Sequence, residues 1–226
     1  MEERNTVKFK KEEFAVKEYI KSSLGKGKVS QVKIVYTPIG EKIVISTTKP
    51  GLVIGRRGEN IDKLTETLKT EFKMGNPKID IDEIMIPEFD SQIIADEIAL
   101  QLERFGPIKF KVIAYRTLQK IMKAGAMGVE IRLNGKLPSK RAKSWRFAQG
   151  YLKKTGEPSK MVYRAQATAQ TKPGTVGVKV AILAPGVKLI DRIDVDEKLI
   201  KSLEENSETL NEEPKIEKIK KVKKKK

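Results

Sequence analysis

The most telling segment of the chain reads Val53-Ile54-Gly55-Arg56-Arg57-Gly58-Glu59-Asn60-Ile61. Two glycines flank two arginines, an apolar pair precedes them, and a helical pattern follows. Glycine has no Cβ, so a nucleic-acid backbone can approach such a turn closely. The opening of the following helix adds unpaired N–H groups and a partial positive charge, and the arginines add full charges. This GXXG pattern predicts a site for the nucleic-acid backbone at Gly55, Arg56, Arg57 and Gly58.

The elements predicted around this loop follow the order of an RNA-binding module. A helix is predicted over 9–24, strands over 32–36 and 42–47, a helix over 61–74 and a third strand over 79–82. This order is that of the type II KH fold, in which a three-stranded sheet packs against helices. Its GXXG loop clamps about four backbone nucleotides of single-stranded RNA. Asn60 and Lys63, early in the helix, are further RNA-binding candidates. The alternative for the loop is a purely structural strand-to-helix turn.

A second region begins at Pro87. Asp90 or Ser91 can cap a helix that runs to Arg104. A further helix is predicted over 109–123, and strands over 129–133, 161–169 and 175–183. A long basic loop is expected between the first two of these strands, over 134–151. The fold class is therefore α+β, with an α-β-β-α-β KH domain (1–86), an α-α-β-β-β domain (87–190) and a charged, mostly disordered tail (191–226).

Positive charge is concentrated in the predicted second domain. The whole chain carries a net charge of +17. Residues 107–172 contain sixteen Lys and Arg but only two acidic residues, Glu130 and Glu157, which leaves a net charge of +14. Residues 191–226 contain eleven basic and ten acidic residues and net only +1. A field of this kind suits a polyphosphate partner. The alternative is a solvated basic surface with no partner.

Two groups of side chains in this basic domain are candidate RNA contacts, because basic residues neutralise phosphates and aromatic rings stack on unpaired bases. The second helix supplies Lys109, Lys111, Arg116, Lys120 and Lys123, of which all but Lys111 share one stripe. The same helix is expected to turn Val112, Tyr115, Leu118 and Met122 toward a core. The basic loop supplies Lys136, Lys140, Arg141, Lys143 and Arg146, with Trp145, Phe147 and Tyr151 as possible stacking residues. The alternatives are an ordinary solvated helix face for the stripe, and anchoring of the loop to its domain for Trp145 and Phe147.

The composition excludes several kinds of chemistry. The chain has no cysteine and no histidine, which rules out disulfides and Cys/His zinc sites and removes the commonest general base. Carboxylates could still bind a metal in principle, but no EF-hand spacing appears. We expect no catalytic residue, metal, cofactor or small-molecule substrate. No apolar run approaches the roughly 20 residues that a membrane span needs. The start of the chain lacks the apolar core of a secretory signal, so no membrane partner is expected.

Four motifs together resemble those of one family. They are Pro50-Gly51-Leu52-Val53-Ile54-Gly55-Arg56-Arg57-Gly58-Glu59-Asn60-Ile61, Gln101-Leu102-Glu103-Arg104, Gly125-Ala126-Met127-Gly128-Val129 and Gly174-Thr175-Val176-Gly177-Val178-Lys179-Val180. Over roughly residues 9–186 the chain resembles the universal small-subunit ribosomal protein three family, whose members carry a type II KH domain. The short N-terminus and the Lys/Glu tail are similar to those of archaeal members.

The resemblance implies a structural protein of the small-subunit head, in the cytoplasmic ribosome, and not an enzyme. The implied partners are ribosomal RNA, neighbouring head proteins, and mRNA near its entry to the ribosome. In the family, the helix after Gly106 carries basic residues that face incoming mRNA, including an adjacent arginine pair. Aligned by Phe110 and Gly125, that pair falls on Lys111 and Val112, and Arg116 matches a basic position of the family.

Two other functions stay open on the sequence alone. A free-standing KH regulator of mRNA would share the loop and the charge, but most of it would be found outside ribosomes. A nucleic-acid lyase, an activity reported for some relatives of the family, would use a lysine amine as its nucleophile. No single lysine stands out among the many for that role.

Overall fold

A computed structural model of the chain describes residues 2–38, 40–187 and 189. Within the compact unit that ends at Val187, the buried apolar residues form two separate clusters. One cluster draws on residues 16–74 and the other on residues 94–182. The predicted tail, 191–226, lies outside the described residues. No helix in the described part of the chain is both long and apolar enough to cross a membrane.

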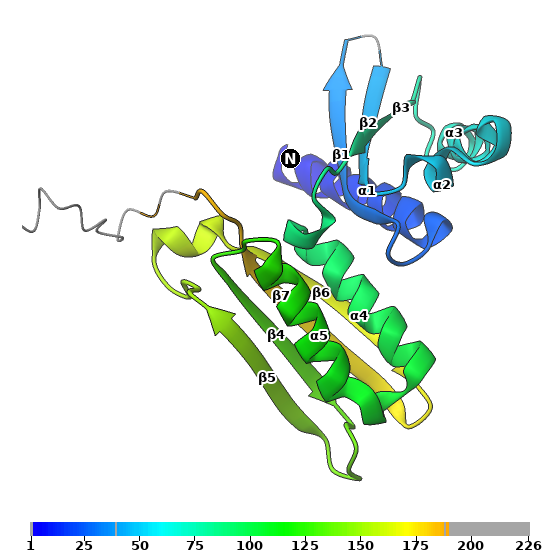
Figure 1. Cartoon of the computed structure of the whole chain (residues 1–226). Helices are drawn as coiled ribbons and strands as arrows, with labels where there is room; N and C mark the ends of the chain where they lie inside the picture. Colours follow the sequence, from blue (N-terminus) through cyan, green and yellow to red (C-terminus); the bar gives the residue numbers. More distant parts are fainter. Residues whose placement is uncertain (1, 39, 188, 190–226) are drawn as a thin grey trace, which may run out of the picture. The chain divides into compact units, whose positions relative to one another are not determined.

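The first half contains the three-stranded sheet expected of a KH fold (Figure 1). Its elements, in order, are α1 (Glu2–Leu24), β1 (Val29–Thr37), β2 (Gly40–Thr47), α2 (Pro50–Ile54), α3 (Glu59–Thr70) and β3 (Lys78–Glu83). Strand β2 lies in the centre, antiparallel to β1 and parallel to β3. Ile20 of α1 and Leu68 of α3 are fully buried against Ile43 and Ile45 of β2. The apolar side chains that recur at helical spacing in α1 and α3, and those that alternate in β2, therefore pack in one core.

One element of this half differs from the prediction. The loop does not join a strand directly to a helix, because the short helix α2 lies between β2 and Gly55. Pro50 occupies the first turn of α2, where its fixed φ favours a helix start. A five-residue helix is too short to show an apolar period, so the sequence pattern did not reveal it.

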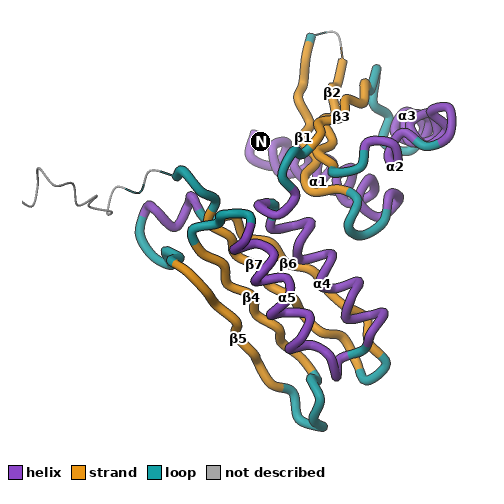
Figure 2. The backbone as a smooth tube through the Cα atoms, viewed as in Figure 1, coloured by secondary structure: helices purple, strands orange, loops and turns teal. Residues whose placement is uncertain are grey.

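The second half is a four-stranded antiparallel sheet with two helices on one face (Figure 2). Its elements are α4 (Ser91–Phe105), α5 (Phe110–Lys123), β4 (Gly128–Gly135), β5 (Lys143–Gly150), β6 (Tyr163–Thr171) and β7 (Gly174–Leu183), and the strand order is β5-β4-β7-β6. Asp90 caps α4 as predicted, since its carboxylate accepts hydrogen bonds from the backbone N–H groups of Gln92 and Ile93. Ile131, Leu133, Val178 and Ile182 cover the helix-facing side of the sheet.

The predicted basic loop over 134–151 is wrong in its second half. Residues Lys143–Gly150 form β5, an edge strand paired with β4 in the register Asn134↔Ser144 to Gly128↔Gly150. The domain therefore has four strands where three were expected. Trp145 and Phe147 alternate with Arg146 and Ala148, which is the period of a strand. Three basic residues in a short stretch hid that alternation among features typical of an exposed loop.

The apolar face predicted for α5 is also partly wrong. Leu118 is buried, but Val112 and Tyr115 are 66% and 56% exposed. The buried positions are Phe110, Ile113, Ala114, Thr117, Leu118 and Ile121. Thr117 supplies the explanation: its hydroxyl donates to the backbone carbonyls of Ile113 and Ala114, so a polar residue can sit in the core face.

Short polar contacts join the turn before β1 to the second half. Lys26 Nζ lies 3.1 Å from a carboxylate oxygen of Glu103 and donates to the carbonyl of Thr168 at 3.0 Å. The backbone N–H of Gly27 donates to Asp96 at 3.1 Å. Asp96 is 8% exposed, and its burial raises its pKa against the lowering effect of hydrogen bonds from Gly27 and Gln92. These contacts place charged groups of α4 at the edge of the KH fold.

Candidate nucleic-acid interface

The GXXG loop is an exposed turn between two helices. Gly55 has φ 76° and ψ −175°, and Gly58 is left-handed at φ 87°. Arg57 also has a positive φ, 55°, an uncommon conformation for a residue with a side chain. Gly58 is the N-cap of α3 and offers no side-chain acceptor; the N–H of Glu59 bonds to the carbonyl of Arg56, and no side chain of the N-cap covers the N–H groups that follow it in the first turn. Both arginines are exposed beside them.

Asn60 and Lys63, also predicted to bind RNA, take up different positions. Asn60 donates to the carbonyl of Leu52 at 3.3 Å and so ties α3 back to α2. A Cβ built on Gly55 would lie 2.7 Å from the Asn60 side chain, which shows how tightly the loop closes there. Lys63 is exposed and forms an ion pair with Glu59 one turn away, and the hydrogen bond from Lys63 lowers the pKa of Glu59. Asn60 thus shapes the loop, while Lys63 adds a charge that Glu59 partly offsets.

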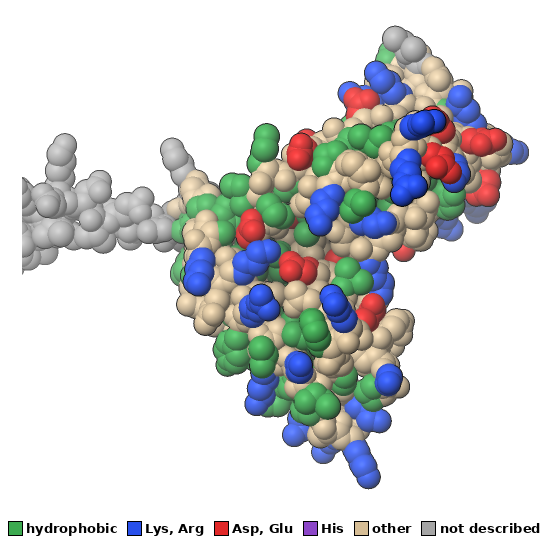
Figure 3. Space-filling view, turned by 45° about the vertical axis from the view of Figure 1, so that its right-hand side comes forward, with side chains coloured by type: hydrophobic (Ala, Val, Ile, Leu, Met, Phe, Trp, Pro, Cys, Tyr) green, Lys and Arg blue, Asp and Glu red, His purple; other side chains and the backbone are tan. Residues whose placement is uncertain are grey.

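A second cationic surface lies at the turn between β4 and β5, which we call the β4–β5 tip (residues 136–143). Its exposed basic residues are Lys136, Lys140, Arg141 and Lys143. Leu137 is fully buried in the core of the second half and anchors the turn. Figure 3 shows acidic side chains over the upper part of the molecule, and Lys and Arg without acidic neighbours at its lower end. The sequence from Ile131 to Arg146 contains no acidic residue, so this tip keeps its full positive charge.

The three aromatic candidates have separate roles. Phe147 is 6% exposed and contacts the rings of Phe110 and Tyr115, so it is a core residue and is not available to stack on a base. Trp145 is half-buried, with its ring centroid 5.3 Å from that of Phe110. Tyr151 is 47% exposed. The prediction of stacking is therefore wrong for Phe147, because its place on β5 turns it toward the helices.

The basic residues predicted on α5 divide into two groups. Arg116, Lys120 and Lys123 line one groove between α4 and α5. Lys120 lies 3.6 Å from Glu88 and 3.8 Å from Glu97, so part of its charge is already balanced. Lys109 lies instead over the ring of Phe105, and Lys111 lies over Trp145 with its Nζ 4.9 Å from the ring centroid. Lys111 is exposed beside the exposed Val112, so the position of the family's arginine pair is open to a ligand.

Sequence reasoning missed a third basic group, on the sheet face away from the helices. Its members are Arg132, Lys154, Arg164 and Lys179, and Arg146, predicted as a loop residue, belongs with them. The alternation in β4 and β7 places Arg132 and Lys179 opposite the apolar side of each strand. Only the pairing register, which the sequence does not reveal, brings them side by side.

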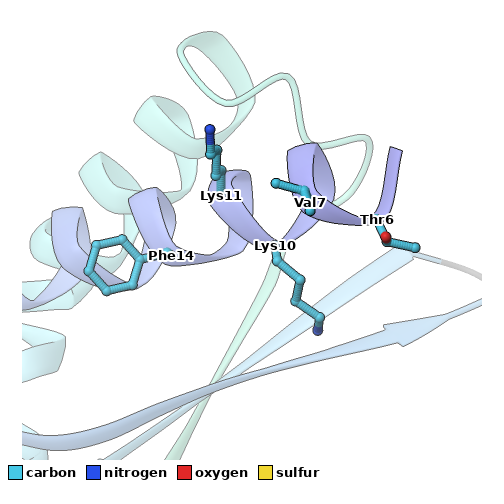
Figure 4. A pocket seen from close by; sticks show the side chains of 5 residues that line it. All are labelled: Thr6, Val7, Lys10, Lys11 and Phe14. Atoms are coloured by element: carbon cyan, nitrogen blue, oxygen red, sulfur yellow. The ribbon is translucent and has the colours of Figure 1, made fainter. Parts of the chain in front are cut away.

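An apolar hollow along α1 does not form a site. Its lining residues all come from one helix: Thr6, Val7, Lys10, Lys11 and Phe14. Figure 4 shows Lys10 and Lys11 pointing in opposite directions, so their charges do not converge on a ligand. No cluster of metal-ligating side chains occurs among the residues that the structure describes.

Comparison with known proteins matches both halves of the chain. Residues 15–89 match the model of the KH domain, and residues 98–182 match that of the ribosomal protein S3 C-terminal domain. The small ribosomal subunit protein uS3 of Methanocaldococcus jannaschii is 42% identical over 198 residues, which cover 87% of this chain and 94% of that protein. The proteins of the same name from Methanosphaera stadtmanae and Methanococcus maripaludis are 37% and 38% identical over 91% and 94% of this chain, and over 81% and 100% of their own lengths.

Proposed function

The chain belongs to the small ribosomal subunit protein uS3 family, and from that membership we propose that it contacts mRNA near the entry to the ribosome. It is a non-enzymatic component of the small subunit with an RNA-binding KH domain, and its partners are ribosomal RNA and other ribosomal proteins. The finer assignments are also our proposals: a place in the subunit head of cytoplasmic ribosomes, and domains divided near residue 86.

The observation that carries the mRNA proposal is the set of exposed cations on α5. Lys111 is exposed and lies next to the exposed Val112, while Arg116, Lys120 and Lys123 line a groove on another side of α5. Lys111 on one side of α5 and the group Arg116, Lys120 and Lys123 on another side offer phosphate contacts to a single strand that passes over the helix, and such contacts carry affinity without sequence preference. The GXXG loop and the β4–β5 tip are two further proposed contacts, with ribosomal RNA as the expected ligand.

Crosslinking in purified small subunits tests this assignment. Subunits are loaded with an mRNA that carries photoreactive uridines downstream of the start codon, irradiated, and digested for peptide mapping. We expect crosslinks from this mRNA to the peptide that contains Lys111 and Arg116. Crosslinks from ribosomal RNA are expected at Arg56–Arg57 and at the β4–β5 tip. If no mRNA crosslink maps to α5, while ribosomal RNA crosslinks are found, the protein is a scaffold without message contact.

Sedimentation distinguishes this function from that of a free-standing regulator. Cell extract is separated on a density gradient, and the protein is followed across the fractions. We expect nearly all of it with the small subunit and with whole ribosomes. A major pool in the light fractions, bound to mRNA and lacking ribosomal RNA, would instead support the regulator.

A further inference from the structure

The open face of the second sheet, opposite α4 and α5, carries a cluster of charges that no motif suggested. One acidic residue, Glu130, lies at its centre, and five basic residues surround it. We call this group the cationic hollow; its members are Glu130, Arg132, Arg146, Lys154, Arg164 and Lys179. Five positive charges and one negative charge leave a net charge of +4.

The strand register sets three of these cations in one row. Arg132 of β4 lies directly opposite Arg146 of β5 on one side and Lys179 of β7 on the other. Side chains that face each other across a sheet have Cβ atoms about 4.5–5.5 Å apart, and like charges there destabilise the sheet. A row of three cations therefore opposes the stability of the free protein, and a bound anion would relieve that repulsion.

Glu130 holds part of the row in place. It is 4% exposed, and it forms ion pairs with Arg132, with Arg146 at 3.0 Å and with Lys154 at 3.3 Å. Burial raises the pKa of Glu130, but hydrogen bonds from Arg146, Arg132 and Lys154 together outweigh it, so the pKa is lowered. The carboxylate is ionised at neutral pH and fixes three cations around itself, yet it balances only one of them.

The sheet leaves room beside this carboxylate. The residues paired with Glu130 on the neighbouring strands are Ala148 and Ala181, whose side chains are short. The resulting hollow has a volume of about 360 Å3. Arg164 also lines the hollow, and its guanidinium is held in place because it donates to Ser159 Oγ at 2.6 Å and to the carbonyl of Lys154 at 3.4 Å. A charged group can therefore enter between side chains that are already held in position.

We propose that the cationic hollow binds a phosphodiester group of RNA, with Arg132 and Lys179 as direct ligands and Glu130 as a positioning residue. Three guanidinium groups suit phosphate oxygens, which they can bind through two parallel hydrogen bonds. The surrounding stretch, residues 107–172, has a net charge of +14, which favours a polyanion with regularly spaced charges over an isolated acidic group. This proposal rests on the RNA-binding role of the chain, but it uses a different face from the GXXG loop, the β4–β5 tip and α5.

The test compares two double variants of the full chain that remove equal charge. Arg132→Gln with Lys179→Gln removes two cations from the row. Lys160→Gln with Lys172→Gln removes two exposed lysines outside the hollow and serves as the matched control. Binding of a labelled single-stranded fragment of small-subunit RNA is measured by fluorescence anisotropy over a range of salt concentrations. We expect the row variant to bind at least ~10-fold more weakly, with a smaller slope of log K against log salt by about 1.4 for two lost phosphate contacts.

A single variant of Glu130 separates positioning from net charge. Glu130→Gln makes the protein more positive, so a simple charge effect would strengthen RNA binding. A positioning role predicts weaker binding, by about 3- to 10-fold, because the three cations lose their common anchor. The unfolding midpoint of each variant is measured by circular dichroism, so that a loss of fold is recognised. Tighter binding by a folded Glu130→Gln protein would overturn the positioning role.

The remaining outcomes separate this inference from the proposed function. Arg56→Gln with Arg57→Gln removes two charges from the GXXG loop, and its loss of RNA binding shows how much that loop contributes in the same assay. Equal losses in the row variant and its matched control would refute the hollow while leaving the RNA-binding role intact. A wild-type protein that fails to bind small-subunit RNA would refute the role itself. Two further anions are tested in the same assay. Displacement of RNA by inorganic phosphate at submillimolar concentration would indicate a small-anion site, and binding of polyglutamate as tight as that of RNA would indicate an acidic protein partner. Either result would overturn the RNA assignment.

Discussion

Gly55 and Gly58 occupy the same motif but meet different physical constraints. Gly58 lies in the left-handed region, which other residues reach at a cost of about 1–2 kcal/mol. Gly55 combines φ 76° with ψ −175°, a region that is almost exclusive to glycine. The room around the two glycines differs as well. A Cβ on Gly58 would meet only Asp62 at 3.9 Å, while one on Gly55 would collide with Asn60. Two glycines in a GXXG pattern could be foreseen from the sequence, but this difference between them could not.

Gly55→Ala should therefore be the more damaging of the two substitutions. We expect it to lower the free energy of unfolding by about 2–4 kcal/mol, because it adds backbone strain and displaces the hydrogen bond from Asn60 to Leu52. Gly58→Ala should cost about 1–2 kcal/mol. Urea denaturation of both variants checks the order. Asn60→Ala in the Gly55→Ala background is the control, and it should recover part of the loss by removing the collision. A larger cost at Gly58 would contradict this account.

At Trp145, by contrast, we expect a substitution that changes stability only slightly. Its indole Nε1 is buried, and no hydrogen-bond partner for it occurs among the described residues. A buried donor without a partner costs about 1–3 kcal/mol. Trp145→Phe removes that donor but keeps a ring against Phe110, so we expect the free energy of unfolding to change by less than about 1 kcal/mol. Phe147→Ala, which empties a core position, should cost about 3–5 kcal/mol. Thermal unfolding followed by circular dichroism compares the two, and a large loss for Trp145→Phe would show that the indole N–H has a partner.

At the scale of elements, the strands and helices with regular apolar spacing followed the sequence prediction. The exceptions have physical causes. Strand β5 was hidden because its outward residues are basic and because its partner, β4, fixes it from across a turn. On α5, Thr117 satisfies its hydroxyl within the helix and so enters the core, which turns Val112 and Tyr115 outward. A core was predictable, but its boundary depends on local hydrogen bonds that composition does not reveal.

Leu137 allows the anchoring of the β4–β5 tip to be tested. It is fully buried within a turn whose other side chains are mostly exposed and basic, so it fixes the β4–β5 tip to the sheet. Leu137→Ala should lower the free energy of unfolding by about 2–4 kcal/mol. Amide hydrogen exchange at Lys140 and Arg141 should also become faster, and RNA crosslinking at the tip weaker. Lys136→Ala, next to it and exposed, is the matched control, with an expected change of less than about 0.5 kcal/mol. Unchanged exchange at the tip in Leu137→Ala would refute the anchoring role.

At the scale of the whole molecule, charged groups of α4 join the two halves. Within the second half, a hydrogen bond from the backbone N–H of Gln170 lowers the pKa of Glu103, and a hydrogen bond from Lys26, in the turn before β1, lowers it further. The pKa of Asp96 is instead raised, because its carboxyl group is buried. The contacts from Lys26 to Glu103 and from Gly27 to Asp96 were not visible in the sequence, because each joins residues far apart in the chain that become neighbours only when both halves have folded. Family motifs located the two halves, yet contain no information about the contacts between them.

These two carboxyl groups should act in opposite directions on the pH dependence of stability. Ionised Glu103 stabilises the fold, and its contribution is present above the ordinary carboxyl pKa and is lost as the pH falls through the lowered folded pKa. Glu103→Gln should therefore reduce the free energy of unfolding at pH 7 by about 1 kcal/mol, and the difference should shrink as the pH falls below the ordinary carboxyl pKa. Urea unfolding at a series of pH values checks this result. A Glu103→Gln deficit that stays constant as the pH falls through the acid range would mean that the ionised form has no special role.

For Asp96 the contribution is present below the ordinary carboxyl pKa and is lost as the pH rises through the raised folded pKa. Asp96→Asn should therefore be as stable as the wild type or more stable at pH 7, and should lose that advantage in acid. Glu157→Gln, at an exposed position, is the control for both variants and should change stability by less than about 0.5 kcal/mol at either pH. A strong loss of stability in Asp96→Asn at pH 7 would contradict the direction of the Asp96 shift.

The parallel pairing of β2 with β3 has a consequence for how the protein acquires its shape. The chain that joins these two strands runs through α2, Gly55–Gly58 and α3, so the GXXG loop is part of the crossover. Parallel strands need a crossover connection between them, so β3 reaches the sheet only where the chain returns through α2, the loop and α3. We therefore expect β3 to pair and the RNA-binding loop to close together during folding. On this expectation, a nascent chain that has completed its first sheet already presents a finished loop.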